Sequence, residues 1–270
     1  MTRQRVDSLL AERGLAGSRT SAAASVRAGR VRIGPDGPLA VKPSQLVADD
    51  AELLLEQPPP YVSRGGTKLA NAIAALEVQV DGRDCLDVGA STGGFTDCLL
   101  SNGASRVIAL DVGRGQLDWA LRNDDRVHVL ERFNARDLEF ADLPFDPSLV
   151  TIDVSFISLA LVLPAVASRL APGADVLALV KPQFELGPER VGRGGVVRSA
   201  RDRRAALVAA AAAAERSGLG LRGFASSGLP GPKGNLETFM WCSTAGGGVD
   251  AEEAALRAEP REDGEPEKVR

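Results

Sequence analysis

The chain has 270 residues, 44% of them hydrophobic, with 32 basic and 36 acidic side chains and a formal net charge of −4. This length allows one large domain or two smaller ones, and no apolar run approaches the roughly 20 residues that cross a bilayer. The polar, charged start lacks the apolar core of a secretion signal. Three distant cysteines and a single histidine, His128 in a strand-like stretch, match neither a metal site nor a disulfide framework, so we expect a reduced, cytoplasmic, metal-free protein.

Charge is unevenly distributed along the chain. Residues 246–270 carry eight acids against four bases, which accounts for the whole net charge and leaves the rest of the chain neutral. Within that neutral part, the first 48 residues hold eight bases and three acids. A basic surface suited to nucleic acid is therefore compatible with the acidic overall charge.

Residues 1–56 form the first predicted module. Helical spacing of apolar residues predicts helices over 5–13 and 18–27, and glycines end both. Short apolar runs predict strands over 30–34 and 51–56. The module is too short to bury a large core, so we expect a small α+β binding domain.

The order of residues in this module resembles the small RNA-binding domain of ribosomal small-subunit protein four, pseudouridine synthases and tyrosyl-tRNA synthetases. The positions that carry the resemblance are Arg5, Asp7, Leu10, Gly14, Ser18, Arg19, Ala23, Gly29 and Val31. The resemblance implies RNA binding, since arginine is well suited to phosphate. The candidate phosphate contacts are Arg3, Arg5, Arg19, Arg27, Arg30 and Arg32, with a solvated surface charge as the alternative for each.

Residues 57–63 contain three consecutive prolines and are predicted to be a semi-rigid linker. A helix is expected over 64–76, with Lys68 in its first turn. The helix dipole disfavours a cation at that place, which suggests a functional role for Lys68. The alternative is a solvated surface lysine.

The stretch from Cys85 to Gly94 reads as a strand, a glycine-rich turn and the start of a helix. The spacing Gly89-x-x-x-Gly93-Gly94 differs from that of a dinucleotide site, so a ligand without a pyrophosphate is favoured. A second strand ends in Asp111, about where such folds place the carboxylate that binds ribose hydroxyls. Together they indicate S-adenosylmethionine (AdoMet), and the alternative is a turn that only connects two elements.

Alternating strands and helices predict the fold of residues 64–245. We expect a doubly wound, Rossmann-like α/β methyltransferase sheet with seven mainly parallel strands. An alanine-rich packing helix is predicted over 201–215, and an acidic, disordered tail over 246–270. The strands are expected near 84–88, 106–111, 127–131, 148–153, 175–181, 221–226 and 237–243.

Charged residues stand where three of these strands begin or end: Asp153, Lys181 and Glu237. With Lys68, they occur in the order and context of the lysine-aspartate-lysine-glutamate tetrad of the FtsJ-like ribose 2′-O-methyltransferases. Over residues 3–244 the chain is similar to the TlyA-type, or hemolysin A-like, rRNA methyltransferases. The further motifs are Tyr61-Val-Ser-Arg-Gly-Gly66, Lys181-Pro-Gln-Phe-Glu185 and Gly192-Arg-Gly-Gly-Val-Val-Arg198. This resemblance implies methylation of a cytidine 2′-hydroxyl in ribosomal RNA of the large and often the small subunit.

The expected chemistry requires removal of a ribose hydroxyl proton as the oxygen attacks a sulfonium methyl group. A lysine becomes a useful base when desolvation and a nearby cation lower its pKa. Lys181 is the candidate general base, with Lys68 as the cation and Asp153 and Glu237 orienting the lysines. Two alternatives stay open: Lys181 as an electrostatic partner of the developing alkoxide, and a tetrad that forms only structural salt bridges.

For the cofactor, we expect Gly89, Ser91, Gly93 and Gly94 along the methionine portion, Asp87 at its amino group and Asp111 at the ribose. Asp137, in the stretch 134–137, is a candidate for the adenine, with a polar loop as the alternative. Phe156 is expected against the methionine portion, or else in the core. Arg190, Arg193 and Arg198, in a glycine-rich loop, are candidate RNA contacts or solvated charges.

The leading hypothesis is therefore an AdoMet-dependent enzyme that acts as a monomer on ribosomal subunits. An RNA-binding or assembly factor without turnover is the second hypothesis, although the intact tetrad counts against it. A membrane-lytic protein, suggested by the hemolysin name, is the third, and it leaves the RNA-binding module unexplained.

Overall fold

The computed structural model describes residues 2–246 and 248–259. Contacts within the chain divide it into two units, Met1–Pro59 and Pro60–Arg270, and the division falls inside the predicted linker. Each unit has its own hydrophobic core. Among the described residues, no helix combines the length and the apolar character that a membrane crossing requires.

The first unit is a small α+β domain. Helices α1 (Val6–Glu12) and α2 (Arg19–Arg27) follow the predicted spacing, and Val6, Leu10 and Val26 from them are fully or almost fully buried. Two antiparallel pairs complete the unit: β2 (Val31–Ile33) with β4 (Leu53–Leu55), and β1 (Arg3–Arg5) with β3 (Leu46–Ala48). The pair β1 and β3 was not predicted, because three residues are too few to show an alternating pattern.

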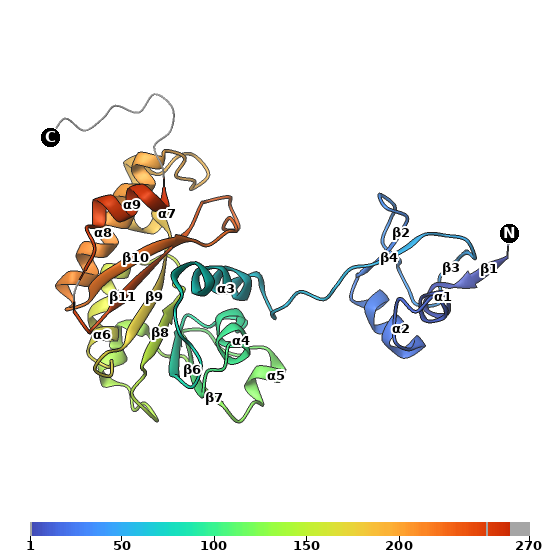
Figure 1. Ribbon diagram of the computed structural model, residues 1–270, viewed down its shortest axis with the longest axis horizontal. Coiled ribbons are helices and arrows are strands. Elements are labelled where there is room, and N and C mark those ends of the chain that lie inside the picture. The colour runs from blue at the N-terminus through green and yellow to red at the C-terminus, as the bar shows by residue number, and fades with distance from the viewer. Residues whose placement is uncertain (1, 247, 260–270) are drawn as a thin grey trace. The chain divides into compact units, whose positions relative to one another are not determined.

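The second unit contains the predicted seven-stranded sheet, in the order β10-β11-β9-β8-β5-β6-β7 (Figure 1). β11 runs opposite to the other six strands, so its pairs with β10 and β9 are antiparallel and the remaining pairs are parallel. The doubly wound, mainly parallel fold expected from the sequence is confirmed. The strands are β5 (Asp84–Val88), β6 (Arg106–Asp111), β7 (Val127–Glu131), β8 (Leu149–Ile152), β9 (Asp175–Val180), β10 (Gly220–Ser226) and β11 (Thr238–Ser243).

Helices cover both faces of this sheet (Figure 1). One face packs against α3 (Arg64–Leu76), α4 (Gly94–Ser101) and α5 (Trp119–Arg122). The other packs against α6 (Leu163–Ala167), the alanine-rich α8 (Ala200–Arg216) and α9 (Ala251–Ala258). Side chains of β9 alternate between the two cores, with Leu177 and Leu179 in the first and the flanking Val176, Ala178 and Val180 in the second. A strand buried on both faces is apolar throughout, as its sequence indicated.

The register of the strands brings distant residues to one edge of the sheet. Val88 lies opposite Ile152 and Ile152 opposite Ala178, so β5, β8 and β9 end close together. Because β11 runs the other way, its first residue, Thr238, lies opposite Val180 near the end of β9. The residues next to these positions are four of the predicted site residues: Gly89, Asp153, Lys181 and Glu237.

Helix α9 shows that the prediction of a disordered tail is wrong for residues 251–258. Asp250 caps this helix by accepting a hydrogen bond from the Glu253 amide (2.7 Å), and Ala254 and Ala255 are buried. Glu259 accepts a charged hydrogen bond from Arg203 of α8 (2.9 Å). The helix is stable here because it packs small residues against α8 and β10. Residue 247 and residues 260–270 lie outside the described part.

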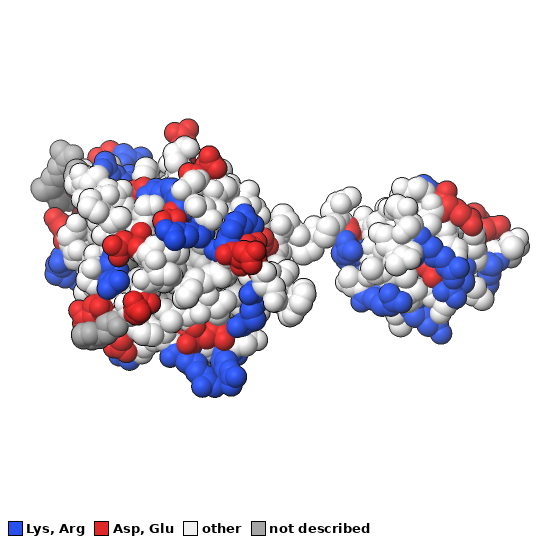
Figure 2. All heavy atoms as spheres, turned by 90° about the horizontal axis from the view of Figure 1, so that it is seen from below, with Lys and Arg blue, Asp and Glu red and all other residues white. Residues whose placement is uncertain are grey.

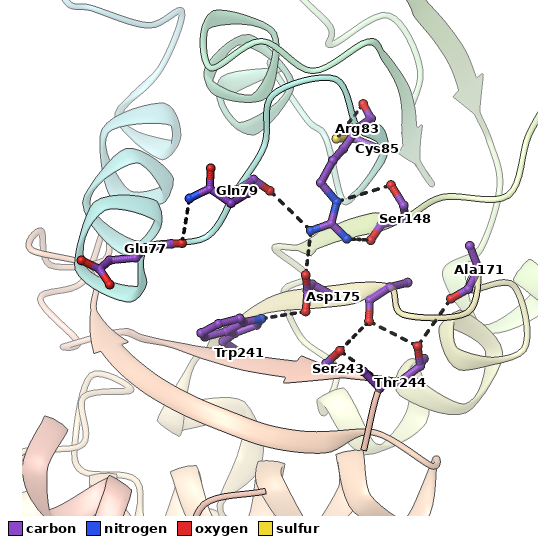
Figure 3. A network of polar contacts seen from close by, with 12 residues as sticks. Glu77, Gln79, Arg83, Cys85, Ser148, Ala171, Asp175, Trp241, Ser243 and Thr244 are labelled. Atoms are coloured by element: carbon purple, nitrogen blue, oxygen red, sulfur yellow. Dashed lines mark hydrogen bonds and ion pairs between the residues drawn. The ribbon is translucent and has the colours of Figure 1, made fainter. Parts of the chain in front are cut away.

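A polar network fastens the opposite end of the sheet, where the parallel strands begin (Figure 3). Arg83, just before β5, pairs with Asp175 at the start of β9 (2.6 Å) and donates to the carbonyl oxygen of Ser148. Asp175 also accepts a hydrogen bond from the Trp241 indole of β11 (3.0 Å). These contacts join four segments at the end of the sheet that is remote from Gly89. They hold the strands in register, and this register sets which residues meet at the Gly89 end.

Candidate active site

Two adjoining cavities lie at the edge where the parallel strands end. One has a volume of about 890 Å³ and the other of about 700 Å³. The first extends over Asp111, and the second contains Lys68, Lys181 and Glu237. Six residues line both cavities: Gly89, Ser91, Asp153, Ser155, Phe156 and Phe184. A ligand in the first cavity can therefore reach a ligand in the second.

The glycine-rich turn forms the floor between the cavities. Gly89 has φ +86°, and a Cβ there would collide with the main-chain carbonyl oxygen of Asp153. Only glycine combines this conformation with so close an approach of β5 to β8. Ser91, also left-handed at φ +50°, donates its amide to Asp111 Oδ2 (2.8 Å).

Asp111 ends β6 and lines the first cavity. Its two carboxylate oxygens accept the amides of Ser91 and Gly113 (2.8 and 2.6 Å), which fixes the carboxylate while leaving lone pairs for ribose hydroxyls. Val112 beyond it is largely exposed and offers an apolar surface in the same cavity. A backbone cradle, a fixed carboxylate and an apolar wall fit an adenosine-containing ligand such as AdoMet.

Five of the eight predicted cofactor residues line the two cavities, and three do not. Gly89, Ser91, Gly94, Asp111 and Phe156 line the cavities. Asp87, Gly93 and Asp137 line neither. A Cβ at Gly93 would collide with Leu121, so this glycine serves packing of the turn against α5. Asp137 is exposed to solvent, and its neighbours Asn134, Ala135 and Arg136 face the first cavity instead.

Asp87 is fully buried beneath the turn. Its carboxylate accepts hydrogen bonds from the hydroxyls of Thr96 in α4 (2.7 Å) and Thr151 in β8 (3.2 Å). Burial raises the pKa of Asp87 to about 7, an effect that these hydroxyls only partly offset. Its side chain points to the α4 face of the sheet and lines neither cavity, which does not fit the predicted contact with the cofactor amino group. Asp87 instead joins β5, α4 and β8 below the site.

Lys68 and Glu237 form a buried ion pair in the second cavity. Nζ of Lys68 lies 2.5 Å from Oε2 of Glu237, and their side chains are 8% and 2% exposed. Lys68 is the fifth residue of α3, so it lies in the second turn and not in the first as predicted. Burial of both charges excludes a solvated surface lysine. A buried pair contributes little net stability, because desolvation offsets the attraction.

Lys181 and Asp153 form the second pair of the tetrad. Nζ of Lys181 lies 2.5 Å from Oδ1 of Asp153 and donates a hydrogen bond to Oγ of Ser155 (2.8 Å). The Lys181 side chain is only 11% exposed, and it lines the same cavity as Lys68. The four predicted side chains therefore surround one space, which also adjoins the first cavity.

Phe156 stands at the mouth shared by both cavities. It is 90% exposed, so it is not a core phenylalanine. Its backbone is left-handed (φ +62°), and its ring packs on Phe184 with centroids 5.2 Å apart. An exposed aromatic ring in a conformation that costs energy is typical of a ligand contact.

The glycine-rich loop that carries Arg190, Arg193 and Arg198 forms part of the rim of the second cavity through Val191 and Gly195. All three arginines are exposed, and Arg190 pairs with Asp202 (2.6 Å). Asn235, which is buried, holds this loop by donating to the Gly195 carbonyl (2.7 Å) and accepting from the Val197 amide (2.9 Å). The loop is thus tied to the segment that leads into Glu237.

In the first unit, Asp7 organises two of the predicted arginines. It is buried, and it pairs with Arg5 (2.7 Å) and Arg19 (3.4 Å). The hydrogen bond from Arg5 is the main reason why the pKa of Asp7 falls to about 2. Arg3 and Arg27 are exposed, whereas Arg30 and Arg32 are half-buried. Basic side chains spread over the face of this unit seen in Figure 2.

Sequence reasoning missed Ser155, Arg64 and Lys233 as residues of the second cavity. Ser155 lies in the motif Asp153-Val-Ser-Phe156, and its position two residues after a strand-end acid is a signal that could have been used. Lys233 lies in a glycine-rich turn before β11, which has no such signal.

The chain has clear relatives among known proteins. Residues 61–244 match the FtsJ-like methyltransferase family. The 16S/23S rRNA (cytidine-2′-O)-methyltransferase TlyA of Mycobacterium tuberculosis is 50% identical over 244 residues, 90% of each chain. YqxC of Bacillus subtilis, provisionally named an rRNA methyltransferase, is 42% identical over 93% of this chain and 89% of its own. A solved structure of a hemolysin-named protein from Streptococcus thermophilus is 40% identical, with a TM-score of 0.70 and 96% of each chain covered.

Proposed function

The chain belongs to the FtsJ-like methyltransferase family and is an AdoMet-dependent methyltransferase, and we propose that it methylates the 2′-hydroxyl of a cytidine in ribosomal RNA. The observation that carries the proposal is the convergence of Lys68, Asp153, Lys181 and Glu237 on one cavity beside the glycine-rich turn. The names of two relatives that cover about 90% of this chain support ribosomal RNA as the substrate. Such a substrate also supports the cytoplasmic location expected from the sequence.

AdoMet, when bound, supplies an electrophilic methyl group. The glycine-rich turn and Asp111 would hold it in the first cavity, with Gly89 and Ser91 at the boundary to the second. The target ribose would enter the second cavity, which shares six lining residues with the first. Proximity of two held reactants alone is worth several orders of magnitude in rate.

Lys181 removes the proton from the 2′-hydroxyl in this proposal. Its position between Asp153 and Ser155 fixes the amine at the junction of the two cavities. Lys68 supplies a second positive charge to the same space, which stabilises negative charge on the ribose oxygen. Glu237 keeps Lys68 in place and compensates its burial.

The N-terminal unit contributes binding to RNA in this proposal. Arg5 at the end of β1 and Arg19 at the start of α2 both pair with Asp7 of α1, which brings their two guanidinium groups together. Arg193 and Arg198 offer further exposed cations at the catalytic unit. Arginine binds phosphate in a bidentate manner, so these groups suit an RNA backbone.

The variant Lys181→Arg tests the base role, because a guanidinium remains protonated and cannot accept the hydroxyl proton. We expect methyl transfer from labelled AdoMet to ribosomal subunits to fall by about 10²- to 10⁴-fold, the usual contribution of a general base. Binding of AdoMet, measured by calorimetry, should be unchanged. Lys42→Arg, at an exposed lysine of the first unit, is the matched control.

Transfer at the wild-type rate by Lys181→Arg would refute the base role and favour a purely electrostatic one. Wild-type protein that binds subunits but transfers no label would instead be an assembly factor. Leakage of liposomes without any methyl transfer would support the membrane-lytic hypothesis.

A further inference from the structure

Among the described residues, Ser155 is the one that accepts a hydrogen bond from the side-chain amine of the proposed base, Lys181. Its Oγ accepts a hydrogen bond from Lys181 Nζ at 2.8 Å. Asp153 Oδ1 is closer, at 2.5 Å, yet it accepts no hydrogen bond within the described part of the chain. The angle of that contact is therefore poor, and Asp153 supplies charge without direction. We propose that Ser155 is a positioning residue that aims the Lys181 amine at the ribose hydroxyl.

The stereochemistry of an amine explains why direction matters. A neutral lysine has two N–H bonds and one lone pair, and only the lone pair accepts a proton. Rotation about the last carbon–nitrogen bond moves the lone pair over a full circle unless an acceptor holds an N–H. With one N–H directed to Ser155, the lone pair is limited to the two remaining staggered positions, and attraction of the other N–H by the Asp153 charge favours one of them. All three residues line the second cavity, so that direction is available to the substrate.

Ser155 lies on an exposed loop that is held by the residues that follow it. It follows β8 and precedes Phe156, whose ring packs on Phe184 of α7 (Pro182–Glu185). Glu185 of the same helix accepts hydrogen bonds from the Ser158 hydroxyl (2.6 Å) and the Leu159 amide (2.9 Å). Because α7 begins directly after Lys181, the loop of Ser155 and the base are tied to one short element. This arrangement gives the serine a fixed distance to the amine.

Ser155 takes no part in the covalent step. The ribose oxygen gains the methyl carbon from the sulfonium, whose sulfur keeps the bonding electron pair, and the hydroxyl proton passes to Nζ of Lys181. The serine hydroxyl accepts the same hydrogen bond before and after the transfer. Its loss should therefore lower the rate of the chemical step and leave the binding of both substrates intact. The inference rests on the proposed role of Lys181 as base.

The test compares Ser155→Ala with Ser155→Thr, which keeps the hydroxyl. Single-turnover methyl transfer to ribosomal subunits is measured together with the affinities for AdoMet and for the subunits. We expect Ser155→Ala to be about 10- to 100-fold slower with unchanged affinities, as for a misdirected catalytic group. Ser155→Thr should recover to within about threefold of the wild-type rate. Ser168→Ala, which removes a hydrogen-bonded serine hydroxyl next to α6, is the control.

A wild-type rate in Ser155→Ala would overturn the inference, and so would a slow Ser155→Thr with unchanged affinities. Loss of affinity for AdoMet in Ser155→Ala would likewise overturn it, because it would assign the serine to the cofactor. Lys181→Arg separates the two proposals. If Lys181→Arg is inactive while Ser155→Ala is normal, the base role stands and only the positioning role fails.

Discussion

At the level of single residues, the site contrasts two ways of keeping a carboxyl group in a protein interior. Glu237 is almost fully buried and is matched by a cation, Lys68, at 2.5 Å. Asp87 is fully buried, and its hydrogen-bonding partners are the threonine hydroxyls of Thr96 and Thr151. A hydroxyl stabilises a carboxylate less than a cation does, so burial dominates at Asp87 and its pKa rises to about 7.

The raised pKa of Asp87 predicts a pH-dependent stability. Between about pH 4 and pH 7 the unfolded chain has lost the Asp87 proton while the folded protein keeps it, so folding stability falls as pH rises through this range. The loss is at most about 1.4 kcal/mol per pH unit. Asp87→Asn removes the titration, and the free energy of unfolding of this variant, relative to wild type, should rise over the same range.

Denaturant unfolding of both proteins at several pH values measures that difference. Below pH 4 and above pH 7 the difference should be constant, because the two states then hold the same number of protons at this residue. A difference that does not change between pH 4 and pH 7 would show that Asp87 is ionised in the folded protein throughout.

At the level of elements, two glycines of the glycine-rich turn have different structural roles. Gly89 lets the end of β5 approach the Asp153 carbonyl, whereas Gly93 makes room for Leu121 of α5. Gly89 therefore shapes the cavities, whereas Gly93 allows the turn to pack against α5. The same motif therefore contains one site residue and one structural residue, although they look alike in the sequence.

The variant Gly89→Ala tests the first of these roles. An alanine at φ +86° is strained, and its Cβ would push β5 away from β8 where both cavities meet. Gly173→Ala introduces comparable strain at φ +76°, where a Cβ meets nothing within 4 Å, and serves as the control. We expect both to lose about 1 to 2 kcal/mol of stability, and only Gly89→Ala to weaken AdoMet binding by tenfold or more.

Calorimetric titration with AdoMet distinguishes the two variants once thermal unfolding has shown that both are folded. Equal affinities in Gly89→Ala and wild type would mean that the turn adjusts without cost. Weaker binding in Gly173→Ala as well would mean that general destabilisation, and not the close approach at Gly89, is responsible.

At the level of the whole molecule, two units with separate cores divide the proposed work between RNA binding and catalysis. Arg5 and Arg19 are the most informative residues for a test of RNA binding, because Asp7 holds both in place. Each of Arg5→Gln and Arg19→Gln should weaken binding to ribosomal RNA. Each should also lower the slope of log affinity against log salt by about 0.7 to 0.9, the value for one lost phosphate contact.

The chain provides a closely matched control for this experiment. Arg126 makes a bidentate pair with Asp124 two residues away, as Arg5 does with Asp7, but it lies in the second unit. Filter binding at several salt concentrations should give Arg126→Gln the wild-type slope. An unchanged slope in Arg5→Gln and Arg19→Gln would remove these two residues from the RNA surface.

Much of the fold was readable from the sequence, since strands buried on both faces appear as apolar runs. Charged residues next to those runs, Asp153, Lys181 and Glu237, could be recognised as site residues, because the ends of neighbouring strands meet at one edge. Elements of three residues, such as β1 and β3, gave no pattern. Helix α9 was missed, although Asp250 and Glu253 form a recognisable capping signal.

The sequence by itself determined the two units, the seven strands of the large sheet, and the residue types available for methyl transfer. Only the tertiary structure decided which face each side chain takes. Asp87 turns toward α4 and lines neither cavity, Lys68 reaches Glu237 across 169 positions, and Ser155 meets Lys181. The physical reason is that side-chain direction depends on strand register and on a few loop torsion angles. Those quantities are set by packing between elements and not by any local stretch of sequence.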